Sequence, residues 1–154
     1  MPAAKPGAKA PMFSVPTTAG EFRLGDQGAE NLVLYFYPRD NTPGCTLEGS
    51  DFRDLAPDFR RARTRILGVS TDTLESHRKF REKMKFPFEL GSDEGHALAS
   101  LFGAWKQKNM YGRKMMGVER STFLIDPKGV IRREWRKVRV KGHAAEVLEA
   151  ARGL

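Results

Sequence analysis

The stretch 38-PRDNTPGCT-46 contains Cys45, the only cysteine among the 154 residues. A single thiol forms no internal disulfide, so it is either a reactive group or an inert buried side chain. Thr42 is a good helix N-cap, Pro43 suits the first helical position, and Gly44 allows another group close to the backbone. This register makes Cys45 the third residue of a helix, where unpaired N–H groups and the positive end of the helix dipole favour a thiolate.

The helix end alone does not make such a thiol an efficient nucleophile. A free cysteine has a pKa of ~8.5 and is a few per cent ionised at neutral pH, whereas a helix end contributes roughly 0.3 to 2 kcal/mol, or about one pKa unit. Even complete ionisation increases the thiolate fraction only about thirtyfold. A catalytic Cys45 therefore requires a nearby cation and donors that stabilise a leaving oxygen.

The elements expected around this stretch predict an α/β fold, with a central mixed β-sheet flanked by helices and an N-terminal β-hairpin. The run 32-LVLYFYP-38 is typical of a central strand buried on both faces. Pro57 lies inside the helix that follows Cys45 and should kink or split it. Strands are expected at residues 12–15, 21–24, 32–38, 66–70, 88–90, 119–126 and 130–138, and helices at residues 43–62, 73–84, 95–102 and 143–154.

Length and composition indicate one compact domain. Residues 1–11 are rich in Ala, Pro and Lys, which predicts a flexible N-terminal tail before a single domain over residues 12–154. This tail has no hydrophobic segment of the kind found in signal peptides, and no apolar run approaches the length of a membrane span. We therefore expect a cytoplasmic protein that does not enter a membrane.

Two stretches resemble the peroxiredoxin family, and within it the bacterioferritin comigratory, or Q-type, subgroup. Pro38, Thr42 and Cys45 form the pattern P-x-x-x-T-x-x-C, and 33-VLYFYPRDNTPGCTLEGSDFRD-54 is similar to the active-site segment of that family. The stretch 107-QKNMYGRKMMGVERSTFLIDPKG-129 is similar to the K-x-x-Y-G and E-R-S-T-F stretches of the subgroup. The resemblance covers nearly the whole chain and implies a thioredoxin-like fold.

The resemblance also implies a thiol peroxidase that reduces hydrogen peroxide and small organic hydroperoxides. Cys45 would be the peroxidatic cysteine, which attacks the hydroperoxide and becomes a sulfenic acid. Thr42 would hydrogen-bond the peroxide, and Pro38 would shield the sulfenate from solvent. Gly44 belongs to the expected substrate-binding segment. No metal and no bound cofactor are expected.

Arg120, in 119-ERSTF-123, matches the arginine that holds the thiolate and polarises the peroxide in the family. A guanidinium stays charged and presents several donors in one plane, so a single arginine can face both a sulfur anion and a peroxide oxygen. Glu48, one turn beyond Cys45, is near enough to orient such an arginine. An ordinary first-turn glutamate, favoured by the helix dipole, is an equally good interpretation of Glu48.

The chain departs from the subgroup in having no resolving cysteine. The position five residues after Cys45, where many members carry one, is Ser50, and the alternative position in the next helix is near Arg81. Ser50 is compatible with a natural residue and with an introduced replacement for cysteine. The sulfenic acid would then be reduced by an external thiol, such as thioredoxin or glutaredoxin with glutathione. The subgroup resemblance favours a monomer.

Two alternatives remain open at this stage. The net charge is +8, and the basic clusters 60-RRARTR-65 and 132-RREWRKVRVK-141, the latter with Trp135, could belong to a nucleic-acid-binding module with an incidental thiol. No nucleic-acid-reading motif accompanies them, so we do not expect nucleic acid as a partner. A redox sensor or holdase that keeps the fold but turns over poorly is the second alternative.

The remaining side chains that could do chemistry are three histidines and a group of apolar residues. We expect His77, His96 and His143 to be ordinary surface or core residues, because they lie on different elements. The apolar group could form a rim near the active site that admits larger hydroperoxides or docks a reductase, or could simply pack in loops and core. Its members are Trp105, Met110, Tyr111, Met115 and Met116.

Overall fold

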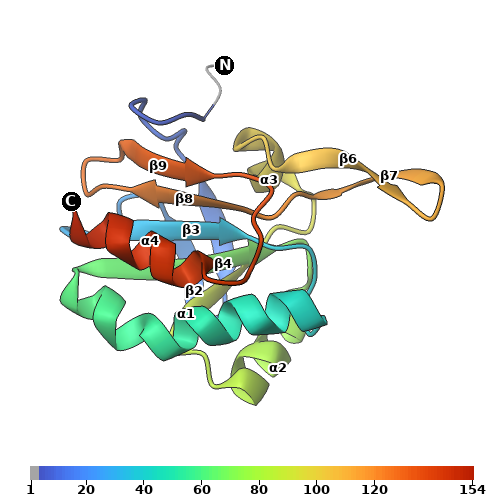
Figure 1. Ribbon diagram of the computed structural model, residues 1–154, viewed down its shortest axis with the longest axis horizontal. Helices are drawn as coiled ribbons and strands as arrows, with labels where there is room; N and C mark the ends of the chain where they lie inside the picture. Colours follow the sequence, from blue (N-terminus) through green and yellow to red (C-terminus); the bar gives the residue numbers. More distant parts are fainter. Residues whose placement is uncertain (1–3) are drawn as a thin grey trace.

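A computed structural model describes residues 4–154. Its strands are β1 Ser14–Thr17, β2 Gly20–Arg23, β3 Asn31–Phe36, β4 Thr64–Ser70, β5 Glu89–Ser92, β6 Trp105–Met110, β7 Arg113–Val118, β8 Ser121–Ile125 and β9 Ile131–Trp135. Its helices are α1 Pro43–Arg61, α2 Leu74–Met84, α3 Ala97–Leu101 and α4 His143–Arg152. Within the described residues, one sheet has the strand order β2-β1-β5-β4-β3-β8-β9, and β6 pairs with β7 in a separate hairpin (Figure 1).

The central sheet is mixed, as the sequence predicts. Strands β3, β4 and β5 run parallel, whereas β8 is antiparallel to β3 and β9 is antiparallel to β8. β1 and β2 form the expected N-terminal hairpin. All six residues of β3 are buried, because helices or loops cover both faces of this central strand. The α/β class with a thioredoxin-like sheet is confirmed.

The alternation of β3 divides the interior into two cores. Val33 and Tyr35 face the layer formed by α1, α2 and α4, where Phe52 of α1 stacks on Tyr35 with ring centroids 4.7 Å apart. Leu34 and Phe36 face the opposite core, which includes residues of α3. Figure 1 shows α1 and α4 lying across one face of the sheet. The strand leading to the cysteine is therefore fixed from both sides.

The helix that carries Cys45 has nearly the predicted extent and is not divided at Pro57. α1 is a single helix of 19 residues with Pro57 inside it, so of the kink or split expected at this proline, the split was wrong. Phe52, Ala56 and Phe59 are buried along one face of α1. Tertiary packing of this apolar face offsets the hydrogen bond that a proline removes from the helix interior.

The N-terminal segment also differs from the flexible tail expected over residues 1–11. Residues 1–3 lie outside the described residues. From Gly7 onward the backbone bonds to β9 and to the turn before it: Gly7 N donates to Ile131 O at 2.7 Å and Ala10 N donates to Gly129 O at 2.7 Å. Ala10 is buried in the core on the α3 side of the sheet. These backbone hydrogen bonds hold the segment against the sheet edge.

The β6–β7 hairpin was missed by the sequence analysis. Its turn has two residues with positive φ, Tyr111 at 52° and Gly112 at 74°, which suits a tight two-residue hairpin turn. The strands are mostly exposed and carry lysines instead of an alternating apolar pattern. The hairpin projects from the body of the molecule (Figure 1). No helix among the described residues has the length and apolar character needed to cross a membrane.

A close contact in the layer under α1 gives a test of the packing. A Cβ added at Gly49 would lie 2.4 Å from Cζ of Phe86, in a buried site. Gly49→Ala should therefore lower the free energy of unfolding by ~1–3 kcal/mol, measured by urea denaturation. The control Gly95→Ala adds the same methyl group where no atom lies within 4 Å, and should leave stability unchanged or slightly higher. Equal effects of the two substitutions would contradict the packing described.

Candidate active site

Cys45 lies where the central strand passes into the long helix. Thr42 is the N-cap, Pro43 begins α1, and Cys45 is its third residue, as predicted. Thr46 N donates to Thr42 O at 2.8 Å, which is the first hydrogen bond of the helix. The amide groups before it have no partner within the helix and point towards the same end as the cysteine. The Cys45 side chain is buried, with 3% of the residue exposed.

The sheet register brings Arg120 to this cysteine from a distant part of the chain. Phe36, at the end of β3, pairs with Ser121, at the start of β8. Because β3 and β8 are antiparallel, the residue before Ser121 emerges at the same end of the sheet as the loop that leads to Cys45. Arg120 Nη2 lies 3.4 Å from Cys45 Sγ and donates to it. A helix end alone stabilises a thiolate only modestly, and the guanidinium of Arg120 is the additional nearby cation that a catalytic Cys45 requires.

Glu48 holds the other side of the same guanidinium. Arg120 Nη1 donates to Glu48 Oε1 at 2.5 Å, and the Glu48 side chain is 1% exposed. Burial raises the pKa of Glu48 to about 7, although the positive charge of Arg120 acts in the opposite direction. Burial alone would lower the pKa of Arg120, but the charges of Glu48 and Cys45 raise it. Of the two interpretations of Glu48, the structure agrees with contact to Arg120.

The other residues expected in the site lie on the loop and first turn beside Cys45. A Cβ added at Gly44 would lie 3.2 Å from Arg120 Nη2, so glycine leaves room for the guanidinium. The Thr42 hydroxyl makes no capping bond; it donates to Arg39 O at 3.1 Å and keeps its acceptor positions free. Pro38 is half-buried and lies two residues after the end of β3.

A buried polar network anchors this loop and was missed by the sequence analysis. The Asp40 carboxylate accepts a hydrogen bond from the Tyr37 hydroxyl at 2.5 Å and from the Ser76 hydroxyl at 2.8 Å, and lies 2.7 Å from His77 Nδ1. Asp40 N donates to Asp72 Oδ2 at 2.8 Å. The network ties the loop before Cys45 to α2 and β4. Apart from Tyr37, the partners lie more than 30 residues from Asp40, so no local pattern in the sequence connects them.

The same network is the one group of side chains among the described residues that is close enough to hold a metal ion. One ligand atom each of Asp40, Asp72 and His77 lies within 4.8 Å of the others. These atoms already have hydrogen-bond partners: His77 Nδ1 lies 2.7 Å from Asp40 Oδ2, Asp72 Oδ2 accepts from Asp40 N, and His77 Nε2 lies 2.8 Å from Gly91 O. His77 is fully buried, as expected for a core histidine.

The other two histidines are also explained by packing. Burial lowers the pKa of His143 to about 4, and its Nε2 lies 2.8 Å from the Thr122 hydroxyl. His96 stacks on Trp105 with the ring centroids 4.0 Å apart. These contacts support the interpretation of all three histidines as structural residues.

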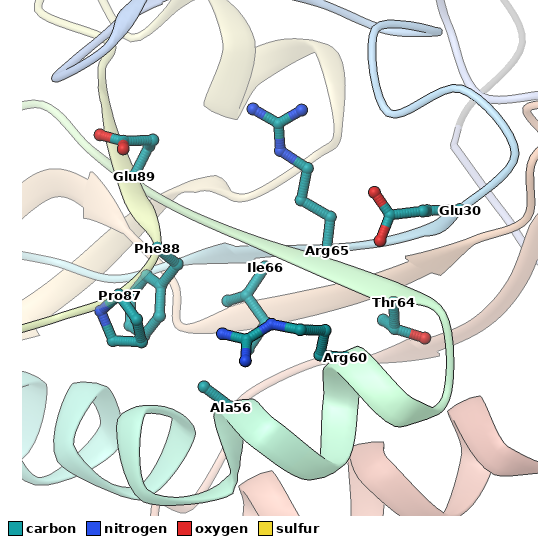
Figure 2. A pocket seen from close by; sticks show the side chains of 9 residues that line it. All are labelled: Glu30, Ala56, Arg60, Thr64, Arg65, Ile66, Pro87, Phe88 and Glu89. Carbon is teal, nitrogen blue, oxygen red and sulfur yellow. The ribbon is translucent and has the colours of Figure 1, made fainter.

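A cavity of about 220 Å³ lies away from the cysteine, near the other end of α1 (Figure 2). Ala56 of α1 lines it, and eleven residues of helix place Ala56 about 16 Å from Cys45 along the axis. Figure 2 shows the Arg60 and Arg65 side chains extending in different directions. The charged groups do not converge on one point, so this cavity adds nothing to the chemistry of Cys45. Its lining residues are Glu30, Ala56, Arg60, Thr64, Arg65, Ile66, Pro87, Phe88 and Glu89.

Taken together, the fold and the site define a class of protein. A thioredoxin-like sheet presents a cysteine in the first turn of a helix, and a guanidinium donates a hydrogen bond to its sulfur. A thiolate stabilised in this way attacks a weak bond between two electronegative atoms, either a disulfide or a peroxide. The chain contains one cysteine and no internal dithiol, so the site is that of a single-thiol enzyme that acts on a peroxide or a disulfide.

Comparisons with known proteins agree with this class. The AhpC/TSA family matches residues 6–134. Peroxiredoxin Bcp of Bacillus subtilis is 48% identical over 149 residues, covering 96% of this chain and 95% of that protein. Peroxiredoxin Bcp of Xanthomonas campestris is 54% identical over 119 residues, 77% of this chain and 74% of that protein. The structure of a cysteine-to-serine mutant of Xylella fastidiosa PrxQ matches this one with a TM-score of 0.92 at 39% sequence identity. The match covers 99% of this chain and 98% of that chain. The chain belongs to the AhpC/TSA family and is a peroxiredoxin, a thiol-dependent peroxidase.

The raised pKa of Glu48 predicts a pH dependence of stability. Between its ordinary value of 4.5 and about 7, folded Glu48 keeps a proton that the unfolded chain releases. The free energy of unfolding should therefore fall as pH rises through this window, by up to about 3 kcal/mol. Glu48→Gln should lose this component, so the variant should gain stability relative to wild type from pH 5 to pH 8.

Urea unfolding of wild type and Glu48→Gln at several pH values measures this difference. The control Glu94→Gln, at an exposed glutamate, should follow the wild-type profile. Parallel profiles for Glu48→Gln and wild type would show that the buried carboxyl does not titrate in this range.

Proposed function

We propose that Cys45 is the peroxidatic cysteine and that it reduces hydrogen peroxide and small organic hydroperoxides. The thiolate attacks one oxygen of ROOH, the S–O bond forms as the O–O bond breaks, and the other oxygen leaves as RO⁻, which takes a proton to become ROH. Cys45 is left as a sulfenic acid. The observation that carries the proposal is the hydrogen bond from Arg120 Nη2 to Cys45 Sγ, 3.4 Å long, at the start of α1.

Arg120 has two roles in this step. It stabilises the sulfur anion before attack, and its planar donors can follow the negative charge onto the leaving oxygen. Glu48 fixes the orientation of the guanidinium through the 2.5 Å contact to Nη1, which leaves Nη2 directed at the sulfur. Glu48 therefore acts as a positioning residue.

Thr42, Gly44 and Pro38 complete the proposed site. The Thr42 hydroxyl can accept a hydrogen bond from the proximal O–H of the peroxide, since its own hydrogen is already donated to Arg39 O. The backbone N–H groups of Gly44 and Cys45 lie in the unpaired first turn and can donate to a peroxide oxygen. Pro38 limits the access of solvent to the sulfenate from the loop side.

The regeneration step requires an external thiol. Cys45 is the only cysteine, and at the family's resolving position the Ser50 hydroxyl donates to Thr46 O at 2.7 Å inside α1. A first thiol condenses with the sulfenic acid to give a mixed disulfide and water, and a second thiol then releases Cys45. Thioredoxin, or glutaredoxin with glutathione, are the proposed reductants. A reducing compartment, the cytoplasm, and a monomeric enzyme fit this cycle.

The choice of organic hydroperoxides as substrates draws on a structural neighbour. Structures of the Xanthomonas campestris bacterioferritin comigratory protein, 46% identical to this chain, were determined to study its alkyl peroxide reduction activity. The sulfenic acid that forms is exposed to a second oxidation, to sulfinic acid, whenever the reductant is slow.

The test follows Cys45 through one cycle. Reduced protein is titrated with hydrogen peroxide, intact mass and dimedone labelling are recorded, and thioredoxin or glutathione is then supplied separately. We expect one sulfenic acid per chain at Cys45, no labelling in Cys45→Ser, and continuous peroxide consumption once a thiol is added. Labelling without turnover would indicate a redox sensor instead, and an unreactive thiol would contradict the proposal altogether.

A further inference from the structure

We propose that the β6–β7 hairpin and the loop between β9 and α4 form a docking surface for an acidic dithiol protein that reduces oxidised Cys45. This inference rests on the proposed peroxidase cycle and names the surface that its reductant contacts. We call it the basic docking surface. Its exposed or half-buried cations are Lys106, Lys108, Arg113, Lys137, Arg139 and Lys141.

One face of the hairpin is basic and lies on the side of the active site. The register pairs Lys106 with Gly117, and Lys108 with Met115, so both lysines are on one face of the hairpin. β7 ends at Val118, two residues before Arg120, so the base of the hairpin lies beside the active site. Burial lowers the pKa of Lys108 and the charge of Arg120 lowers it further, whereas the charges of Cys45 and Glu119 act in the opposite direction.

The loop between β9 and α4, the second part of the docking surface, also contacts Arg120. Val138 N donates to Arg120 O at 3.0 Å, which fixes the loop after β9 beside the active site. Lys137, Arg139 and Lys141 on this loop are exposed. Neither residues 105–118 nor residues 136–142 contain an aspartate or glutamate. In Figure 1 both segments and the start of α1 lie at the same end of the molecule.

Exposed apolar side chains accompany these charges. Tyr111 at the hairpin tip is 99% exposed, Met115 on the basic face is 52% exposed, and Leu47 in the first turns of α1 is 50% exposed. Tyrosine and methionine are enriched in protein interfaces, where they fill pockets inside a polar rim. A two-stranded hairpin is only marginally stable on its own in water, and a partner on its exposed face would stabilise it.

The size of the surface indicates that the reductant bound there is a protein and not a small thiol. Each strand of the hairpin has six residues, so its tip extends about 20 Å from its base. A small thiol at Cys45 does not reach that tip. The positive charge and the absence of acidic residues on both segments favour an acidic partner and speed its encounter.

Because Cys45 is buried, a reductant gains from being bound next to it before the thiol is exposed. The sulfur of a protein thiol reaches Cys45 only when the first turn of α1 opens, because the residue is 3% exposed. A partner already held on the hairpin and loop stays at high local concentration during such openings. Its first thiol then forms a disulfide with Cys45 and releases water, and its second thiol displaces Cys45 to leave the partner oxidised.

The experiment compares two double variants with the same change of charge. Lys106→Glu/Arg113→Glu reverses the hairpin face. Arg60→Glu/Lys128→Glu reverses two exposed cations away from Cys45, one in the last turn of α1 and one in the turn between β8 and β9. The probes are a thioredoxin of acidic net charge, coupled to its reductase and NADPH, and dithiothreitol. Peroxide consumption is measured over a range of thioredoxin concentrations, at low and high salt.

The hairpin double variant should lose about tenfold or more in kcat/KM for thioredoxin, with a weaker salt dependence, and keep its rate with dithiothreitol within about twofold. The distal variant should stay near wild type with both reductants, and Tyr111→Ala should raise KM for thioredoxin only. An equal loss in both double variants, no loss in the hairpin variant, or no turnover of wild type with thioredoxin would each overturn the docking surface.

A fluorescent oligonucleotide gives a further test. If wild type bound it, and the hairpin substitutions abolished that binding but left the thioredoxin kinetics unchanged, the surface would be assigned to nucleic acid and the inference would be overturned. The dithiothreitol reaction separates this test from the proposed function. If wild type consumed no peroxide with dithiothreitol, the peroxidase proposal itself would fail.

Discussion

The structure of the site depends on one guanidinium placed between two buried acidic groups. Arg120 donates to Cys45 Sγ with one nitrogen and to Glu48 Oε1 with another, and both partners are almost inaccessible to solvent. A charge buried in this way is tolerated only when it is paired. The guanidinium therefore places a positive charge and a hydrogen-bond donor beside a sulfur that is otherwise buried. Its planar fork also fixes where the positive charge points, which an ammonium would not do.

The protonation state of Glu48 changes the charge that faces Arg120. When its carboxyl is ionised, the charge of Arg120 is shared between carboxylate and sulfur, and when it is protonated the guanidinium is directed mainly at the sulfur. A pKa of about 7 for Glu48 places both states within the physiological range. The net charge of the Arg120–Glu48 pair therefore changes with pH near neutrality.

The scaffold enforces this contact through register and anchoring. The antiparallel pairing of Phe36 with Ser121 sets Arg120 at the end of the sheet from which the cysteine loop emerges. Asp40 holds that loop to α2 through the Ser76 hydroxyl and to the loop between β4 and α2 through Asp72. The strand beneath is buried on both faces, so it fixes the start of the loop that carries the sulfur beside the guanidinium.

The sequence predicts local features of the site better than distant ones. The position of Cys45 in the helix follows from the cap chemistry of Thr42, Pro43 and Gly44, which is local. The approach of Arg120 depends on strand register, and only the family resemblance indicated it. The Asp40–His77 contact spans 37 residues and has no sequence signature.

Other elements were missed because their patterns are ambiguous. The β6–β7 hairpin carries lysines and exposed methionines on strands without a clear apolar alternation, so the periodicity that reveals buried strands is absent. Pro57 predicts a break in α1 that packing of the buried face overrides. The N-terminal segment has a tail-like composition, and its hydrogen bonds are made by backbone atoms that any sequence supplies.

The most direct test of the central claim is the stopped-flow rate constant for hydrogen peroxide with reduced protein, beside free cysteine at the same pH. Ionisation alone gives an acceleration of about thirtyfold, so a peroxide held by Arg120 should react on the order of a thousandfold faster than free cysteine or more. Arg120→Lys, which keeps the charge but loses the planar fork, should fall well below wild type. A wild-type rate within about thirtyfold of free cysteine would contradict the account, because ionisation alone would then explain it.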